Sequence, residues 1–450
     1  MGEDFDLIVI GGGSGGLAGA FRASSHGAKV ALLEPGALGG TCVNVGCVPK
    51  KAMWQAAELA GQLRAARGFG FALPPDAPLD WKQLLLRRGS YIENIHAAYR
   101  RRLEAAGIAV FPQRGRLCAE PGTVIAGELR WRAPKILLAT GGQPTRPDIP
   151  GAELGEVSDD FFAWQAPPSR VAIIGGGYVG VELASVLQAL GSRVSLFVRQ
   201  SRLLADFDAE ITGRLAESFR QAGIDIRFDT AVSALQPEGE GLRVLDADGS
   251  AHGPFERVLF ATGRRPATAG LGLDEAGISC DDKGRVKIDA WQASARPDVF
   301  AVGDVTPQPP LTPVAIAAAR RLMDRLFGGD AESRLELAQV PTVVFAHPPL
   351  ATLGLGEEAA RQRHGDEAVR VFRADFRPML QALSDGPHRS VFKLVCVGED
   401  ERVVGLHLVG PGSDEILQGF AVAMRMGMTR RDLQRTLAIH PTSAEEVVLI

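Results

Sequence analysis

Two cysteines, Cys42 and Cys47, lie close together in the segment GGTCVNVGCVPKK. The whole chain of 450 residues contains only five cysteines, which is too few for a disulfide scaffold and typical of a reducing, cytoplasmic setting. A closely spaced pair in such a setting is more often catalytic, redox-sensing or metal-binding than structural. Thiol–disulfide exchange is therefore the first chemistry that the sequence suggests.

The four residues between the two cysteines do not suit a regular helix, in which positions five apart point to different sides. A bridge between them needs a local distortion, which Gly46 permits, and Pro49 fixes the chain just beyond. A zinc site is the main competitor, but the nearest histidines in the sequence are His26 and His96. We therefore expect no metal, with two packed, inert thiols as a further alternative.

A second candidate for chemistry lies in the segment AIHPTSAEEVV near the C-terminus, where His440 precedes an expected helix. Thr442 with Glu445, or Ser443 with Glu446, forms a capping box, so either glutamate has a structural explanation. Alternatively, a carboxylate orients the His440 ring and raises its basicity for acid–base work on a thiol. The residues alone leave both interpretations open.

The elements that must position these side chains include an internal repeat, because residues 6–34 and 170–199 follow one pattern. Each segment has a short apolar run, a glycine-rich turn, a stretch of helical periodicity and a second apolar run. This is the strand–turn–helix–strand order of a dinucleotide-binding βαβ unit. Two such units predict two dinucleotide sites in one chain.

In the first unit, Gly11, Gly13 and Gly16 occupy the G-x-G-x-x-G positions. The first two allow a tight turn and a close approach to a pyrophosphate, and the third allows the helix to pack on the strand. Glu34 ends the second apolar run, where it can accept hydrogen bonds from a ribose. The alternative is a packed glycine turn with a solvated Glu34.

In the second unit, Gly175, Gly177 and Gly180 fill the same positions, but the second apolar run ends in Arg199. An acid at this point favours NADH, whereas an arginine attracts the 2′-phosphate of NADPH. Arg199 therefore predicts NADPH. The alternative is a surface arginine beside a site that binds NADH by other means.

The remaining segments alternate between helical and strand-like patterns. Residues 50–110 are largely helical in pattern, KILLATGG and RVLFATGRRP are buried-strand runs with a Thr-Gly turn, and VFAVGD is a strand that ends in Asp304. A helix is expected over residues 311–327. From about residue 340, strands and turns give way to C-terminal helices, which predicts a separate α+β module.

Composition and charge exclude several classes of protein. The chain is 46% hydrophobic and 23% charged, as in globular proteins, and its length suggests roughly three domains. The formal net charge of −4 provides no basic surface for a nucleic acid. No apolar stretch reaches the roughly 18–20 residues that span a bilayer, and the acidic N-terminus MGEDFDLIVI does not read as a signal peptide.

The chain as a whole resembles the pyridine nucleotide–disulfide oxidoreductases, on the segments GGGSGG, GGTCVNVGCVPKK, GGGYVGVELA, VGD, TPVAIAA and HPTSAEE. The resemblance implies an α/β fold with two Rossmann-like dinucleotide-binding domains, for FAD and NADPH, and a C-terminal α+β dimerisation domain. It implies an FAD-binding domain over residues 1–145, completed by 266–335, an NAD(P)H-binding domain over 146–265 and the dimerisation domain over 336–450. A head-to-tail homodimer is expected.

The resemblance also implies a role for each candidate catalytic residue. Cys42 attacks the substrate disulfide, and Cys47 faces the flavin as the charge-transfer thiolate. His440 of the other subunit, oriented by Glu445, protonates the departing thiol.

Further positions match the contacts that the family makes with its two cofactors. Tyr178 resembles a gate over the flavin, and Lys50 and Glu182 resemble an ion pair beside it, although a solvated Lys50 is the alternative. The residues that match contacts with FAD are Gly11, Gly13, Ser14, Gly15, Gly16, Glu34, Thr41, Cys42, Lys50, Gly115, Thr140, Gly141, Asp304 and Thr312. The other residues that match cofactor contacts are Gly175, Gly176, Gly177, Val179, Gly180, Glu182, Arg199, Arg202 and Gly263.

The substrate is implied by similarity to family members that reduce oxidised glutathione. Ser14, Tyr99, Ile316 and Arg320 match positions that hold glutathione, and an arginine at 320 suits a carboxylate of the tripeptide. Trp54 fits these members better than those specific for trypanothione.

Three departures keep other members of the family in view. Phe21 stands where some members carry a substrate-binding arginine, although Arg22 follows; Ala205 replaces a second 2′-phosphate arginine, for which Arg202 is a substitute; and Gly180 replaces a frequent alanine. An NADH-dependent reductase of glutathione amide is therefore an alternative. Dihydrolipoamide dehydrogenase requires an acid in place of the arginine at 199, mercuric reductase requires an additional C-terminal cysteine pair, and a flavin redox sensor is the non-enzymatic alternative.

Overall fold

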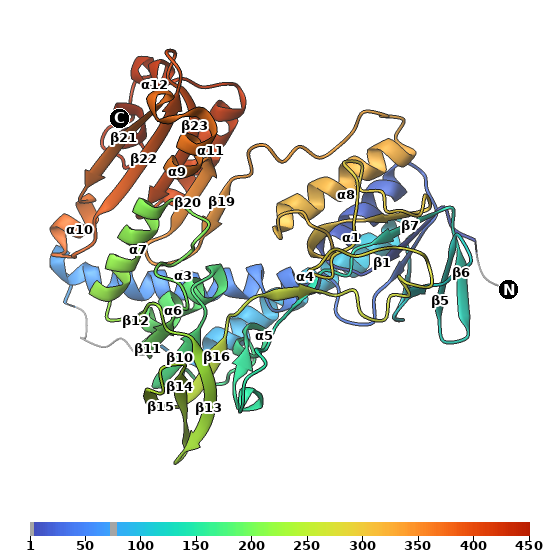
Figure 1. The fold of residues 1–450 in the computed structure, drawn as a ribbon, viewed down its shortest axis with the longest axis horizontal. Coiled ribbons are helices and arrows are strands. Elements are labelled where there is room, and N and C mark those ends of the chain that lie inside the picture. Colours follow the sequence, from blue (N-terminus) through green and yellow to red (C-terminus); the bar gives the residue numbers. More distant parts are fainter. Residues whose placement is uncertain (1–3, 73–78) are drawn as a thin grey trace. The chain divides into compact units, whose positions relative to one another are not determined.

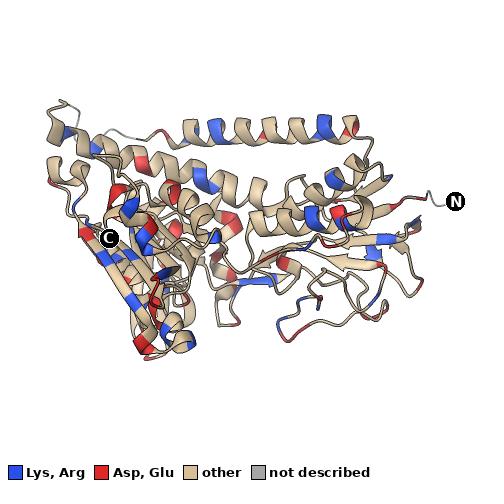
Figure 2. Ribbon diagram, turned by 90° about the horizontal axis from the view of Figure 1, so that it is seen from above, with Lys and Arg blue, Asp and Glu red and all other residues tan. Residues whose placement is uncertain are grey.

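The computed structural model describes residues 4–72 and 79–450, and the chain divides into two compact units (Figure 1). One unit holds the residues up to Lys50, Gln83–Thr145 and Arg264–Glu336, and the other holds Lys51–Lys82, Arg146–Gly263 and Leu337–Ile450. Acidic and basic residues are interspersed along the helices and strands (Figure 2). Among the described residues, no helix is both long enough and apolar enough to cross a membrane.

The first unit is built on a five-stranded parallel sheet. Its strands, in spatial order, are β18 (Val299–Ala301), β7 (Lys135–Leu138), β1 (Leu7–Ile10), β2 (Val30–Leu33) and β3 (Ala109–Phe111). All four residues of the central strand β1 are buried, as expected for a parallel sheet that is covered on both faces. The apolar run that opens the sequence therefore becomes the centre of this unit.

The two faces of this sheet are covered differently. Leu7 and Val9 pack against α1 (Ser14–Ser25), α8 (Thr312–Phe327) and the end of α4 (Trp81–Ala105). Ile8 and Ile10 face a three-stranded antiparallel sheet of β4 (Arg116–Leu117), β5 (Thr123–Ala126) and β6 (Leu129–Arg132). Alternation along β1 follows the two-residue period of a strand. An antiparallel ribbon of β8 (Gly142–Pro144) and β17 (Arg264–Pro266) also belongs to this unit.

The second unit contains another parallel sheet, with β12 (Asp225–Arg227), β11 (Arg193–Phe197), β10 (Arg170–Ile174), β16 (Arg257–Phe260) and β9 (Glu156–Val157) in spatial order. Helix α6 (Tyr178–Ala189) contacts β10 and β11, and α7 (Ala209–Gln221) contacts β12. The core of this half includes Phe197 and Phe260 packed against an antiparallel sheet of β13 (Val232–Glu238), β14 (Gly241–Asp246) and β15 (Ala251–Phe255). The order of elements repeats that of the first sheet.

The C-terminal part of the second unit is an antiparallel sheet. Its strands are β19 (Thr342–Val344), β20 (Leu350–Gly354), β23 (Arg402–Val409), β22 (Ser390–Val397) and β21 (Val369–Phe376), in spatial order. One core joins the sheet to α11 (Ser413–Arg425), α12 (Arg430–Arg435) and α13 (Glu445–Leu449), and α9 (Glu357–His364) packs on a second cluster. The shorter elements are α2 (Gly40–Asn44), α5 (Ser158–Phe161), α10 (Met379–Leu383), η1 (Ala66–Phe69), η2 (Ala152–Leu154), η3 (Gly303–Val305) and η4 (Asp366–Ala368), and α3 spans Cys47–Ala65.

The predicted fold class is confirmed: two Rossmann-like sheets and a C-terminal α+β part are all present. One local prediction is wrong, because β18 ends at Ala301 and Asp304 lies in the following 3-10 turn instead of at the strand end. The left-handed backbone of Gly303, with φ of +77°, turns the chain there. Of the largely helical stretch predicted over residues 50–110, residues 73–78 lie outside the described residues.

Candidate functional site

The first glycine turn brings helix α1 very close to strand β1. Gly11 has φ of +108°, and a Cβ there would lie 2.4 Å from the carbonyl oxygen of Ala139. A Cβ on Gly16 would lie 1.8 Å from the carbonyl oxygen of Gly11, so only glycine allows this packing. In front of the helix, a Cβ on Gly13 would meet nothing closer than 3.8 Å. The N-terminus of α1 is therefore open to a phosphate group, as the motif predicts.

Glu34 follows strand β2 and returns to the glycine turn. Its carboxylate accepts hydrogen bonds from the backbone N–H of Gly12 at 2.6 Å and of Gly36 at 2.7 Å. Each carboxylate oxygen can accept more than one bond, so Glu34 can hold the loop and still accept from a ribose hydroxyl. This geometry differs from the alternative interpretation, in which the Glu34 carboxylate has only water as a partner.

Several residues of the first unit fit the remainder of an FAD molecule. Burial raises the pKa of Asp304, although Arg264 opposes this shift, so the carboxyl suits hydroxyl partners such as those of a ribityl chain. Thr140 donates to the carbonyl of Ala267 at 3.0 Å, which holds the turn after β7. Gly115 is buried against Leu33 and Val124, where a Cβ would not fit. These donors, acceptors and close approaches are compatible with a bound flavin dinucleotide.

The two cysteines lie on either side of a break between two helices. Helix α2 ends at Asn44, Val45 leaves helical geometry with φ of −141° and ψ of 36°, and α3 begins at Cys47. A Cβ on Gly46 would lie 2.7 Å from the carbonyl oxygen of Thr41. The predicted distortion is therefore present, and the glycine is required by this close approach.

Both cysteines are thiols in this structure, and their side chains are close enough to form a hydrogen bond. Cys47 Sγ lies 3.6 Å from Thr312 Oγ1, at the start of α8. The hydrogen bond with Cys47, burial and the charge of a Cys47 thiolate raise the pKa of Cys42 well above its usual value, against opposing hydrogen bonds from Thr312 and Ser14. Cys42 therefore needs a proton acceptor before it can act as a nucleophile.

Two of the predicted substrate residues, Ser14 and Tyr99, interact with Cys42. Burial raises the pKa of Tyr99, and the negative charge of Cys42 raises it further. Thr312, Ile316 and Arg320 follow each other at intervals of four residues on α8, so they share one face of that helix. Arg320 is exposed on this face.

Arg22, the substitute considered for an arginine at position 21, is already engaged. Its guanidinium forms an ion pair with Asp324, which also lies 2.9 Å from His26 Nε2. The ring of Phe21 lies beneath the guanidinium of Arg102, 4.6 Å from its centroid. The structure therefore gives Arg22 a structural partner within the first unit.

The second glycine turn repeats the first closely. Gly175 has φ of +126°, and a Cβ there would lie 2.3 Å from the carbonyl oxygen of Ala261. A Cβ on Gly180 would lie 2.0 Å from the carbonyl oxygen of Gly175, whereas one on Gly177 would meet nothing within 4 Å. Helix packing therefore accounts for Gly180 without reference to the type of nucleotide.

Helix α6 carries two of the predicted catalytic residues. Tyr178 is its first residue and is exposed, and Glu182 lies one turn later and is buried. Glu182 accepts a hydrogen bond from the backbone N–H of Phe345 at 2.8 Å. Lys50 belongs to the first unit and Glu182 to the second, so their ion pair stays a prediction.

The loop after strand β11 contains the predicted nucleotide-selecting arginines. Arg199 is exposed, two residues beyond the end of the strand, which suits a phosphate partner. Arg202 donates to the carbonyl of Ala205, so part of its function is to hold the loop. After Arg202, the loop runs to Asp208, the N-cap of α7. In a different loop, Gly263 follows β16 with φ of +130°.

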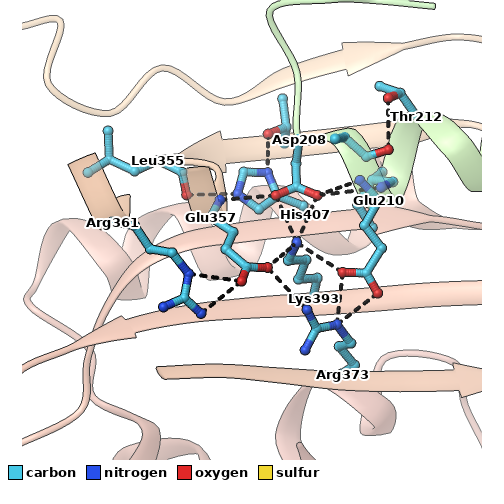
Figure 3. A network of polar contacts seen from close by, with 12 residues as sticks. Asp208, Glu210, Thr212, Leu355, Glu357, Arg361, Arg373, Lys393 and His407 are labelled. Atoms are coloured by element: carbon cyan, nitrogen blue, oxygen red, sulfur yellow. Dashed lines mark hydrogen bonds and ion pairs between the residues drawn. The ribbon is translucent and has the colours of Figure 1, made fainter. Parts of the chain in front are cut away.

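A buried ion cluster anchors the end of this loop, and the sequence did not lead us to expect it (Figure 3). The ammonium of Lys393, with a side chain 3% exposed, lies 3.0 Å from Asp208 and 2.9 Å from both Glu210 and Glu357. Lys393 belongs to β22, a strand in which every residue is buried. A single lysine in the apolar run SVFKLVCV was the signal, because lysine is almost never buried without partners.

His440 and Glu445 lie together near the start of α13. Glu445 contacts His440 Nδ1 at 2.9 Å, and the same carboxylate accepts from the backbone N–H of Thr442 at 3.2 Å. The Thr442 hydroxyl accepts in turn from the backbone N–H of Glu445 at 3.2 Å, which completes a capping box. One carboxylate thus both caps the helix and contacts the His440 ring. The His440 side chain is 78% exposed in the single chain.

Comparison with known proteins finds similarity along essentially the whole chain. The pyridine nucleotide-disulphide oxidoreductase family matches residues 5–319, and the dimerisation domain of the same family matches residues 340–449. The glutathione reductase of Yarrowia lipolytica is 41% identical over 468 aligned residues, which cover 99% of this chain and 98% of that protein. The glutathione reductase of Schizosaccharomyces pombe is 43% identical over 459 residues, with the same coverage.

Proposed function

The chain belongs to the pyridine nucleotide-disulphide oxidoreductases, and we propose that it reduces oxidised glutathione with NADPH through FAD and the Cys42–Cys47 pair. The observation that carries this proposal is the thiol pair at the break between α2 and α3, in a chain with two dinucleotide turns. The names of the two similar proteins support glutathione as the substrate. The scarcity of cysteines supports a reducing, cytoplasmic compartment.

The two glycine turns have different cofactors in this proposal. FAD binds at Gly11–Gly16, and NADPH binds at Gly175–Gly180 with its 2′-phosphate beside Arg199. When bound, FAD supplies the two-electron transfer from the nicotinamide to the cysteine disulfide. The geometry of Glu34 and the exposed Arg199 support this division, because the first suits a ribose and the second a phosphate.

The reduced cysteine pair carries out the exchange in two steps. The Cys42 thiolate attacks one sulfur of oxidised glutathione, so the substrate S–S bond breaks, a mixed disulfide forms and one glutathione leaves as a thiolate. The Cys47 thiolate then attacks Cys42 Sγ, the mixed disulfide breaks, the second glutathione leaves and the Cys42–Cys47 disulfide forms. Two electrons pass from the dithiol to the substrate disulfide.

Proton transfer is assigned to His440 of the partner subunit. The Nδ1–H of the ring donates to Glu445, so Nε2 is the nitrogen that accepts the proton of Cys42 and returns it to the departing thiolate. The raised pKa of Cys42 makes this base necessary. Dimerisation through the C-terminal part is supported by the family match and by three exposed apolar side chains within it, those of Met426, Leu437 and Ile439.

Steady-state reduction of oxidised glutathione tests the proposal, with NADPH and NADH compared on the same purified holoenzyme. We expect a yellow protein that turns over faster with NADPH. Absence of turnover with either nucleotide would refute the substrate, and faster turnover with NADH would refute the assignment of Arg199. A colourless protein without flavin would refute the whole mechanism.

The nucleophile is tested with the matched variants Cys42→Ser and Cys47→Ser. Each should retain FAD and oxidise NADPH with an artificial electron acceptor, while glutathione reduction falls by a factor of about 10³ or more. Only Cys47→Ser retains the thiol that forms the mixed disulfide, so only that variant should trap glutathione covalently. Trapping by Cys42→Ser instead would reverse the two roles.

A further inference from the structure

Asn44 lies between the two cysteines, and its side chain is held on both sides. Its amide nitrogen lies 2.9 Å from the carbonyl oxygen of Gly40, 3.2 Å from that of Leu38 and 3.4 Å from that of Ala37. Its amide oxygen lies 2.8 Å from His96 Nε2. All of these groups belong to the first unit, and none of them has a role in the proposed chemistry.

The orientation of the Asn44 amide follows from these partners. Carbonyl oxygens only accept hydrogen bonds, so the NH₂ group must face them, and the oxygen must then face His96. An amide oxygen cannot donate, so His96 Nε2 carries a hydrogen and donates it. The network therefore admits one arrangement of donors and acceptors, whether or not His96 is protonated at Nδ1.

His96 connects this loop to the helix that carries Tyr99. Its side chain is buried, with the residue 8% exposed, and it lies three residues before Tyr99 on α4. Burial raises the pKa of Tyr99, and the negative charge of Cys42 raises it further. The same helix thus holds the segment between the cysteines at Asn44 and carries a tyrosine that interacts electrostatically with the first cysteine.

We infer that Asn44 and His96 are positioning residues that hold the cysteine loop ready to close, and thereby set the reduction potential of the pair. This inference rests on the proposed function, in which Cys42 and Cys47 form the working disulfide. An unrestrained loop of four residues loses conformational freedom each time the disulfide forms. A loop that is already held in the dithiol state loses less, so the effective concentration of one thiol at the other is higher.

Two measurable consequences follow from a held loop. The disulfide is favoured over the dithiol, so the reduction potential of the pair is more negative than it would be in a loose loop. The attack of Cys47 on the mixed disulfide at Cys42 is also faster, because the attacking sulfur is already in place. A residue that served only the stability of the fold would change neither quantity in the folded, flavin-bound protein.

The test measures the Cys42–Cys47 equilibrium in the holoenzyme, in glutathione redox buffers without NADPH, by alkylation of thiols and mass spectrometry. For Asn44→Ala we expect about a tenfold fall in the closing equilibrium, equivalent to a potential about 30 mV less negative. The mixed disulfide with glutathione should accumulate in the same variant. In turnover, kcat should fall while kcat/KM for NADPH stays unchanged, because the reaction with NADPH is a separate half-reaction.

Variants at His96 separate positioning from folding. His96→Leu should shift the equilibrium in the same direction, whereas His96→Gln, which still offers an N–H to Asn44, should stay within about twofold of the original protein. The control is Glu93→Gln, because Glu93 lies 3.6 Å from His96 Nδ1 on the exposed side and should have no effect. If Asn44→Ala fails to retain flavin, the two His96 variants decide the question.

Two different outcomes would overturn different statements. An original protein that forms no Cys42–Cys47 disulfide refutes the proposed function, and the inference with it. A normal disulfide in the original protein, together with unchanged potentials in flavin-bound Asn44→Ala and His96→Leu, refutes the inference alone. Additive effects in the double variant would also refute it, because a broken hydrogen bond cannot be broken twice.

Discussion

The two glycine turns, which belong to different units, have the same backbone conformation. In each, the first glycine has a positive φ, +108° at Gly11 and +126° at Gly175, and the third glycine touches the carbonyl oxygen of the first. In each, a later backbone N–H returns to the turn, from Gly39 to the carbonyl of Gly12 and from Leu204 to the carbonyl of Gly176, both at 2.8 Å. What is repeated is therefore the backbone geometry that admits a pyrophosphate.

The turns differ in the residue that follows the second strand. Glu34 accepts two backbone N–H groups and so ties its own loop to the turn, whereas Arg199 has only donors and is exposed. The loop that carries Arg199 is anchored further on, where Asp208 contacts Lys393. The two loops are therefore held differently: Glu34 itself ties the first loop to its turn, whereas the second loop is held by the Leu204 N–H and by the anchor at Asp208 and Lys393.

The largest expected effect comes from removing that anchor with Lys393→Met. The substitution leaves the carboxylate of Asp208, whose side chain is 3% exposed, buried without its cation, which should destabilise the protein by about 3–5 kcal/mol. Urea unfolding of the holoenzyme measures this loss. Arg361→Met is the control, since Arg361 contacts Glu357 from a more exposed position and should cost at most about 1 kcal/mol. Equal losses in the two variants would contradict the anchor.

Acid should weaken the same anchor. Burial pushes the pKa of Asp208 up, but hydrogen bonds from the Glu357 backbone and from Lys393 outweigh it and hold the pKa below its usual value. The carboxylate therefore contributes stability that is complete above about pH 4, the unfolded value, and is lost as the pH falls through the lower folded value. Unfolding measured between pH 3 and 6 should show this loss, and Asp208→Asn should show less of it. A loss that begins above pH 6 would assign the effect to other groups.

The next-largest effect is expected from Arg199→Leu, which changes the residue that distinguishes the second turn from the first. Loss of a charge-assisted contact to the 2′-phosphate should raise KM for NADPH by about 10–100-fold and leave KM for NADH nearly unchanged. Steady-state kinetics with both nucleotides measure this change. Arg199→Lys is the matched control, because it keeps the charge but not the paired donors. Its KM for NADPH should lie between those of the original protein and Arg199→Leu. A parallel rise of both KM values would show that Arg199 does not recognise the phosphate.

The corresponding change in the first unit is Glu34→Gln. The amide can still accept one backbone bond but loses the negative charge, which should weaken FAD binding by about tenfold. Flavin fluorescence released on dilution measures the change. Affinity for NADPH, measured in the flavin-loaded fraction, should be unaffected, since Glu34 and the second glycine turn belong to different units. A fall in nucleotide affinity with no loss of flavin would reverse the assignment of the turns.

Local features of both turns could be predicted from the sequence, because glycine spacing and the periodicity of neighbouring residues determine them. The cysteine loop was predictable in the same way, including the distortion near Gly46. Contacts between distant residues were not. Lys393 and Asp208 are 185 positions apart, and only the burial of a strand with one lysine indicates that such a partner must exist.

The substitute roles proposed for single arginines were the weakest predictions, for a physical reason. Arg22 and Arg202 were considered because they lie near the expected positions in the sequence, but a long cationic side chain takes whichever acceptor is nearest in space. Arg22 pairs with Asp324, 302 residues away, and Arg202 donates to the carbonyl of Ala205. Sequence proximity does not reveal such competing acceptors.

The smallest effect is expected from Arg202→Ala, which tests whether Arg202 serves the carbonyl of Ala205 or a phosphate of the nucleotide. Because Arg202 is engaged with the loop, its removal should raise KM for NADPH by no more than about threefold, less than 1 kcal/mol, and should change KM for NADH by a similar factor. The equal change distinguishes support of the loop from recognition of the phosphate, which affects NADPH alone. Ala205→Arg supplies the opposite test: a new guanidinium at that position should lower KM for NADPH and not for NADH. A selective loss of NADPH binding in Arg202→Ala would instead make Arg202 a second phosphate ligand beside Arg199.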